Sequence, residues 1–254
     1  MRLRILTYNT KDGGLGREAL ILDVLKAAQP DVIVLEEVFE PASVQHWAEA
    51  LGMSFFFARG NTRRHLALLS RFPIVSNASF HPNPPIHTAL LEATLQLSSD
   101  LAVRVLGVHL LAGPFVAMEL WRVWELATIL GRVRTGSRDR CVLLGDFNAI
   151  APGDPVNTAA WPSWLKLTLA LQVGRVFRAA IRRVLAAGFV DCFRALHPTD
   201  AGFTLPAAAP NARLDYTFAN AALVGSLSAC RVIREPAAVL TASDHCPLMV
   251  EFDL

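Results

Sequence analysis

Short apolar runs alternate with longer segments of helical periodicity along the chain. The runs are rich in β-branched and aromatic residues and are bounded by glycine, proline and polar clusters, which is typical of strands. We expect strands at 3–8, 32–35, 54–58, 66–71, 74–80, 89–97, 101–108, 141–144, 189–193, 213–218, 227–233 and 246–252. Apolar residues recur at helical spacing over 17–28, 43–51 and 117–133, which predicts helices there. Interspersed strands and helices indicate an α/β or α+β fold.

Two pairs of neighbouring runs predict which strands pair. The runs 89–97 and 101–108 are separated only by Ser98-Ser99-Asp100 and form the strongest hairpin candidate. The runs 66–71 and 74–80, on either side of Phe72-Pro73, are expected to pair in the same way.

The segment 161–187 differs from the rest of the chain because it contains basic residues and no acid. Its cations are Lys166, Arg175, Arg178, Arg182 and Arg183. At helical spacing, Arg175, Arg178 and Arg182 share one face, and Phe177, Ile181, Val184 and Leu185 share the other. Such a basic amphipathic helix suits a membrane surface or nucleic-acid phosphates. The alternative, which we favour, is that the apolar face packs on the domain and water solvates the arginines.

Composition narrows the class of protein without identifying a partner. The 254 residues are 53% hydrophobic, enough to bury a large core, and they contain no repeat or obvious linker, so we expect one domain over 1–254. With 24 Lys and Arg against 22 Asp and Glu, the net charge of +2 is too small to indicate nucleic-acid binding by itself.

The cysteines and the start of the chain suggest a cellular location. Cys141, Cys192, Cys230 and Cys246 are far apart and form no CxxC pair, so we expect buried thiols and no disulfide or zinc site. The first residues turn polar too soon for a signal peptide, and no apolar stretch is long enough to span a bilayer. We therefore expect a soluble, cytoplasmic protein, monomeric and at most peripherally associated with membranes.

Polar residues that interrupt or end the apolar runs carry the chemistry. After the run 141–144, Gly145 permits a turn, and strand alternation then places Asp146 and Asn148 on one side with Phe147 in the core. Asp-x-Asn also occurs in ordinary turns, so this motif alone does not indicate a functional site. The full set of polar residues that interrupt or end the apolar runs is Asn9, Glu37, His109, Asp146, Asn148, Asp215, Asp244 and His245.

If Glu37, Asp146 and Asp244 converge, their charges must be neutralised. Two carboxylates about 4 Å apart repel by about 4 kcal/mol at an effective dielectric near 20. For a ligand set made of oxygen atoms, Mg²⁺ or Mn²⁺ is the natural counter-charge.

The order of these motifs resembles the endonuclease/exonuclease/phosphatase superfamily, which includes pancreatic-deoxyribonuclease-like nucleases, sphingomyelinases and inositol-phosphate phosphatases. The motifs are Tyr8-Asn9, Leu35-Glu36-Glu37-Val38, Leu68-Leu69-Ser70-Arg71-Phe72-Pro73-Ile74, Val108-His109-Leu110, Gly145-Asp146-Phe147-Asn148, Leu214-Asp215-Tyr216 and Ser243-Asp244-His245-Cys246-Pro247. The resemblance implies a four-layer α/β/β/α sandwich of two mixed sheets flanked by helices. It also implies hydrolysis of a phosphoester with a divalent metal.

Carried over position by position, the resemblance implies metal ligands and catalytic groups. Glu37 would be the main metal ligand with Asn9 beside it, and Asp244 would support the metal directly or through water.

The remaining matched positions would act on water and phosphate. Asp146 would orient or deprotonate the attacking water, and Asn148 would contact phosphate or metal. His245, held in one tautomer by Asp215, would act as a base or as a phosphate donor, and His109 would donate to a non-bridging phosphate oxygen.

Two departures from the family pattern matter. The family usually has Gln before its metal-binding Glu, whereas this chain has Glu36, an acid that would add metal affinity or point to solvent. Its apurinic-site repair endonucleases carry Asp and Tyr where this chain has Lys11 and His109, which argues against that activity.

The sequence leaves the substrate open among three classes. A nuclease would use cations such as Arg59, Arg63 and Arg64, whereas a lipid phosphodiesterase of the sphingomyelinase kind would use the apolar loop 110–116 with Trp161 and Trp164. A phosphatase acting on a small phosphate ester needs neither. We favour a metal-dependent phosphoesterase that acts on phosphodiesters; the non-enzymatic alternative is a phosphate-binding scaffold.

Overall fold

The computed structural model describes residues 1–133, 139–172 and 174–254, and their strands form two six-stranded sheets. The first sheet has the order β11-β12-β1-β2-β4-β3. Its members are β1 (Arg2–Asn9), β2 (Val32–Val38), β3 (Ser54–Ala58), β4 (His65–Ser70), β11 (Leu227–Val232) and β12 (Leu248–Asp253). The second sheet has the order β5-β6-β7-β8-β10-β9. Its members are β5 (Ile74–Phe80), β6 (Leu90–Ser98), β7 (Leu101–His109), β8 (Cys141–Asp146), β9 (Val190–Asp191) and β10 (Asp215–Ala219).

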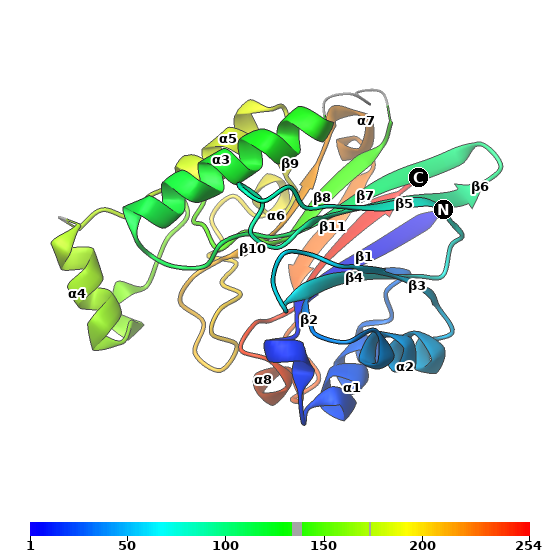
Figure 1. Ribbon diagram of the computed structural model, residues 1–254, viewed down its shortest axis with the longest axis horizontal. Coiled ribbons are helices and arrows are strands. Elements are labelled where there is room, and N and C mark those ends of the chain that lie inside the picture. The colour runs from blue at the N-terminus through cyan, green and yellow to red at the C-terminus, as the bar shows by residue number, and fades with distance from the viewer. Residues whose placement is uncertain (134–138, 173) are drawn as a thin grey trace.

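Helices cover the outer face of each sheet, so the expected four-layer sandwich is confirmed (Figure 1). Each sheet is mixed, because β1 and β2 run parallel in the first and β7 and β8 run parallel in the second. The α-helices are α1 (Glu18–Ala28), α2 (Pro41–Leu51), α3 (Val116–Val133), α4 (Ser163–Leu171), α5 (Ala179–Ala186), α6 (Cys192–Leu196), α7 (Ala221–Val224) and α8 (Val239–Ala242). The described residues also include the 3₁₀ turns η1 (Asp12–Gly14) and η3 (Thr158–Ala160). Helices α1 and α2 pack on the first sheet and α3 and α5 on the second, while α4 projects from one end.

Strand alternation explains why the core has three layers of apolar side chains. In β2, Val34 faces the second sheet and Leu35 faces α1 and α2. In β8, Leu144 faces the first sheet and Leu143 faces α3 and α5. Because successive side chains point to opposite faces, strands buried on both sides read as continuous apolar runs.

The pairing predicted for 66–71 with 74–80 is wrong. Strand β4 already has β2 and β3 as neighbours in the first sheet, whereas β5 pairs with β6 in the second. The turn between them moves the chain from one sheet to the other, and the Ser70 hydroxyl fixes it by accepting from the Phe72 N–H at 2.9 Å. The predicted hairpin of 89–97 with 101–108 is confirmed as β6 and β7.

The single basic helix predicted within 161–187 is also wrong. The chain forms α4 and α5 instead, and Gly174, with φ of 68°, lies between them. Arg175 precedes α5, and the Arg178 guanidinium donates to the carbonyls of Ala151 and Asp154, so these arginines do not share a helical face with Arg182. The alternative, that the apolar face packs on the domain, is correct for α5. Its Ile181 and Val184 are buried against the second sheet and α3.

The predictions of a strand at 189–193 and of buried free cysteines have different outcomes. The run 189–193 is a strand only over Val190–Asp191, after which α6 begins with the Asp191 side chain as its N-cap. All four cysteines are free and buried, as expected. No helix within the described residues has both the length and the apolar character needed to span a membrane.

Helix α3 is tied to the chain segments that leave the second sheet. Arg122 donates to the carbonyls of Leu111 and Gly113 at 2.8 and 2.9 Å. Glu125 accepts from the backbone N–H groups of His87 and Leu111 at 2.8 and 3.4 Å. These bonds fix the segment before β6, which contains His87, and the loop after β7, which begins directly after His109.

Gly145 allows β7 and β8 to lie close together just before Asp146. Its φ is +140°, and a Cβ atom there would lie 2.0 Å from the Val108 carbonyl oxygen.

We expect Gly145→Ala to lower the free energy of unfolding by more than about 1 kcal/mol in urea denaturation. Gly131→Ala, a control in α3 with no atom within 4 Å of the added Cβ, should raise it by up to about 1 kcal/mol. Equal effects of the two substitutions would contradict this account.

Glu125 should make stability depend on pH. Burial raises the pKa of Glu125 from 4.5 to about 7, although the N–H groups of His87 and Leu111 oppose the shift. The unfolded chain therefore ionises first, and this group's contribution to stability is lost as pH rises from about 4.5 to about 7. Glu125→Gln should remove a fall of up to about 3 kcal/mol across that range, measured by urea denaturation at several pH values. Parallel pH profiles for the two proteins would refute the assignment.

Candidate active site

At one end of the gap between the sheets, the side chains that point into the gap change from apolar to polar in several strands. On the side of β2 that faces the gap, Glu36 follows Val34, and on that side of β8, Asp146 follows Leu144. The backbone register pairs Asn9 with Glu36, and it pairs Asp146 with both His109 and Asp215. These five polar residues, Asn9, Glu36, His109, Asp146 and Asp215, are all buried. Strand alternation therefore delivers them to one place.

Glu37 reaches the same place through a break in the register. The pairing of β2 with β4 shifts between Glu36 and Val38, and Glu37 has a φ of 60°. Its carboxylate accepts from the Asn9 amide at 3.3 Å and from the Asp12 N–H at 2.9 Å. The same Asn9 amide donates to Asp146 Oδ2 at 3.0 Å, so Asn9 bridges two acids from different sheets.

Asp146 and Asn148 lie on the same side of the chain, as predicted, and Phe147 is buried. Asn148 donates to Asp146 twice, from its backbone N–H at 2.8 Å and from its amide at 3.1 Å. The amide also donates to the Leu110 carbonyl at 3.1 Å. Together with the Asn9 bond, these contacts fix the orientation of the Asp146 carboxylate.

Asp146 also belongs to a close group with Asp215 and His245. Nδ1 of His245 lies 2.9 Å from Asp215 Oδ2, and Nε2 lies 3.8 Å from Asp146 Oδ2. Burial raises the pKa of Asp146 to about 7, and the nearby Asp215 adds to this shift while His245 opposes it. Burial lowers the pKa of His245, but the carboxylates of Asp215 and Asp146 outweigh it and raise the value to about 10. One ligand atom from each residue lies within 4.8 Å of the others, so this group also fits a metal ion.

His109 lies between the two acids that Asn9 bridges. Its Nε2 is 3.6 Å from Glu37 Oε1 and 3.7 Å from Asp146 Oδ2. Burial, together with the neighbouring His245, lowers the pKa of His109 to about 3, so its imidazole is neutral. Its buried Nδ1 has no hydrogen-bond partner among the described residues. A neutral imidazole here is suited to donate one hydrogen bond to a ligand.

Asp244 lies at the rim of this cluster. Its side chain is 38% exposed, and its carboxylate pairs with Lys11 Nζ at 3.1 Å. The neighbouring Ser243 hydroxyl donates to the Asn9 carbonyl at 2.7 Å and thereby holds the segment that carries Asp244 and His245 against β1.

The cluster includes the cations Arg64, which the sequence analysis named only as one of several arginines that a nuclease would use, and Lys11, which it did not assign to the site. Arg64 lies 3.3 Å from Glu37 Oε2 and 2.7 Å from Asp12 Oδ1, and Lys11 faces Asp244 as described above. Arg64 comes from the basic turn before β4, where spacing alone did not distinguish it from Arg63, whose guanidinium lies over the Phe39 ring.

Glu36 does not point to solvent, which removes one of the two alternatives given for it. It is fully buried, and the Thr7 hydroxyl donates to its Oε1 at 2.5 Å. Burial raises the pKa of Glu36 well above its ordinary range, and Asp215 and Asp146 lie close enough to add to the shift. Its Oε2 has no partner among the described residues. Glu36 therefore lies beneath the acids as a further buried carboxyl group.

A buried ionic network supports the site from below. The Arg213 guanidinium is fully buried and pairs with Asp154 at 2.7 Å and with Asp191 at 2.6 Å. The Tyr216 hydroxyl accepts from the Ala151 N–H at 2.9 Å. These contacts join the start of β10, which carries Asp215, to the loop that follows Asn148.

The donor set fits a hard divalent cation. Glu37 and Asp146 present carboxylate oxygens, whereas Asn9 places its amide nitrogen between them and its amide oxygen accepts from the Lys11 N–H at 2.9 Å. Both acids are buried in a region of low dielectric, where like charges need compensation. Oxygen donors of this kind are those that Mg²⁺ and Mn²⁺ take up.

The chain resembles known proteins in sequence and in structure. Residues 6–245 match the model of the Endonuclease/Exonuclease/phosphatase family. Among curated proteins there is no significant sequence match.

Solved structures share the fold over their whole length. An AP endonuclease from Archaeoglobus fulgidus has a TM-score of 0.80 at 20% identity, covering 99% of this chain and 100% of that one. A 3′-5′ exonuclease from Neisseria meningitidis has a TM-score of 0.74 at 22% identity, with 99% and 100% coverage. TDP2 from D. rerio, complexed with single-strand DNA product, has a TM-score of 0.72 at 18% identity, with 100% and 99% coverage. Because the family model matches nearly the whole length, the chain belongs to the endonuclease/exonuclease/phosphatase family.

Proposed function

We propose that the chain is a hydrolase of phosphodiesters that depends on Mg²⁺ or Mn²⁺. One observation carries the proposal: Glu37, Asp146, His109 and His245, from four separate segments, meet within contacts of 3.6 to 3.8 Å in a buried, oriented cluster. A purely structural role would not require several buried acids to face two imidazoles at the end of an apolar gap. This argues against a non-catalytic scaffold.

Glu37, Asn9, Asp146 and Asn148 would hold the metal, with Asp244 supporting it from the rim. When bound, the cation would neutralise charge on the phosphate oxygens and favour a hydroxide-like water. The cations Arg64 and Lys11, which now pair with Glu37 and Asp244, would remain near enough to bind the phosphate.

The chain's own residues would position water and phosphate. Asp146, fixed by the donors on Asn9 and Asn148, would accept a proton from the attacking water. His245, whose Nδ1 is held by Asp215, would present Nε2 to a phosphate oxygen. His109 would donate its hydrogen bond to a second, non-bridging oxygen. Phosphoryl hydrolysis asks for little else from a protein.

A nucleic acid is one candidate substrate. Proteins of the same fold include an AP endonuclease, a 3′-5′ exonuclease and TDP2 complexed with single-strand DNA product. Their identities to this chain are low, so they support nucleic acid as a candidate substrate class.

A panel of plasmid, single-stranded DNA, phospholipid vesicles and a chromogenic phosphodiester, each with Mg²⁺ and with chelator, would rank the substrates.

Metal binding should stabilise the folded protein independently of turnover. Adding Mg²⁺ or Mn²⁺ to chelator-treated protein should raise the Tm by a few degrees, because a ligand that binds only the folded state stabilises it. Glu37→Gln should remove this shift. Glu49→Gln, an exposed acid on α2, should retain it. A Tm shift of full size in the Glu37→Gln protein would place the metal elsewhere.

Catalysis should depend on the two groups that face the reacting phosphate. Asp146→Asn and His245→Gln should each lower kcat/KM for a chromogenic phosphodiester by at least about 100-fold, the usual contribution of a positioned acid or base. His46→Gln, an exposed imidazole on α2, serves as the control and should leave the rate unchanged. Full turnover by Asp146→Asn would rule out the proposed mechanism.

A further inference from the structure

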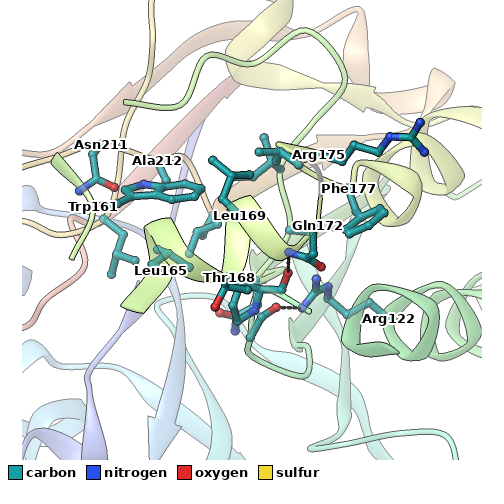
Figure 2. A pocket seen from close by; sticks show the side chains of 18 of the residues that line it. Arg122, Trp161, Leu165, Thr168, Leu169, Gln172, Arg175, Phe177, Asn211 and Ala212 are labelled. Carbon is teal, nitrogen blue, oxygen red and sulfur yellow. Dashed lines mark hydrogen bonds between the residues drawn. The ribbon is translucent and has the colours of Figure 1, made fainter. Parts of the chain in front are cut away.

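Helix α4 carries apolar side chains on opposite sides. Leu165 and Leu169 turn toward a cavity beside the second sheet, as Figure 2 shows. Trp164, Leu167 and Leu171, at the helical spacing i, i+3 and i+7, are 59%, 61% and 76% exposed, although Trp164 also borders the cavity. A helix that is apolar all round is normally buried. The outer side of α4 therefore lacks the cover that its composition calls for.

The exposed surface continues onto the start of α3. Gln172 joins the two helices, because its amide oxygen accepts from the Val116 N–H at 3.0 Å and its amide nitrogen donates to the Pro114 carbonyl at 3.1 Å. Phe115 and Val116 are nearly half exposed, and Leu120, one turn further along, is 63% exposed. We call Trp164, Leu167, Leu171, Phe115, Val116 and Leu120 the apolar face.

Two exposed cations accompany the apolar face on and just after α4, and most of the neighbouring carboxylates are buried. Lys166 and Arg175 are exposed within and just after α4. Between residues 110 and 187 the acids are Glu119, Glu125, Asp139, Asp146 and Asp154. All except Asp139, which precedes β8 in the chain, are buried. The surface thus presents apolar groups and positive charge together.

We propose that the apolar face docks on an anionic lipid bilayer. Leucine and aromatic side chains flanked by Lys and Arg are the composition of helices that lie in the interface plane, with apolar groups among acyl chains and cations at phosphate headgroups. Nucleic acid would satisfy Lys166 and Arg175 but would leave Leu167, Leu171 and Leu120 in water. A lipid surface satisfies both groups.

The position of the cavity relates this surface to the catalytic cluster. The cavity has a volume of about 290 Å³, has α4 as one wall and reaches Asn148 and Leu214. Trp161 and Phe177 make its lining largely apolar (Figure 2). If the chain hydrolyses phosphodiesters, as proposed above, the docked protein would hold an amphiphilic phosphoester with its apolar part in this cavity and its phosphate beside Asn148.

Vesicle binding tests the docking surface without requiring catalysis. The full chain, in chelator, is sedimented with vesicles of phosphatidylglycerol and phosphatidylcholine, and with vesicles of phosphatidylcholine alone. Binding should favour the anionic vesicles and weaken with salt. The triple variant Leu120→Ser, Leu167→Ser, Leu171→Ser should bind at least ~10-fold more weakly, because it loses the inserted apolar groups. A double variant Lys166→Glu, Arg175→Glu should lose the preference for anionic lipid.

Controls separate loss of docking from loss of folding or of catalysis. Val75→Ser, Leu240→Ser removes exposed apolar groups from β5 and α8 and should leave vesicle binding unchanged. The triple variant should keep the wild-type Tm and the wild-type rate on a soluble chromogenic phosphodiester. A wild-type protein that ignores anionic vesicles overturns the proposal, and so does a triple variant that binds like wild type. Dimers that the triple variant abolishes, in the absence of vesicle binding, would assign the face to a second copy.

Discussion

The candidate site depends on acidic side chains that are held in the gap between two apolar sheets. Asp146 and Glu37 come from different sheets, and each would be unfavourable there as an isolated charge. Three features make their burial possible: the Asn9 amide that bonds to both, the two donors of Asn148, and the cation Arg64 beside Glu37. The same arrangement leaves the carboxylate oxygens together at one end of the gap, which is what a divalent cation requires.

The alternation of the strands connects this site to the fold. Inner positions are apolar through most of each strand and pack the two sheets together. At the last inner positions of β1, β2, β7 and β8 the side chains become Asn9, Glu36, His109 and Asp146. The packing that stabilises the sandwich therefore also fixes the geometry of the candidate site. Gly145 and the Arg213 network extend this support to the loop that carries Asn148 and to the start of β10, which carries Asp215.

Much of this could be predicted from the sequence because it rests on local patterns. Period-two runs located most strands, and residues at their ends identified Asn9, His109, Asp146 and Asp215. The sheet to which each strand belongs, and the strands it pairs with, were not predictable in this way. A run such as 74–80 shows that a strand exists but does not specify its neighbour. The break between α4 and α5 was missed because Arg178 is held by distant carbonyls, which spacing does not reveal. Lys11 was missed at the site, and Arg64 was not distinguished from Arg59 and Arg63, because exposed cations look alike in a sequence.

The central claim is that Glu37 and Asp146 share one hard cation between the sheets. The most direct measurement is a crystal structure grown with Mn²⁺ and recorded at a wavelength where manganese scatters anomalously. The account predicts an anomalous peak within coordination distance of oxygen atoms from both side chains. A peak bound by neither residue, or side chains of Glu37 and Asp146 that point away from each other, would contradict it.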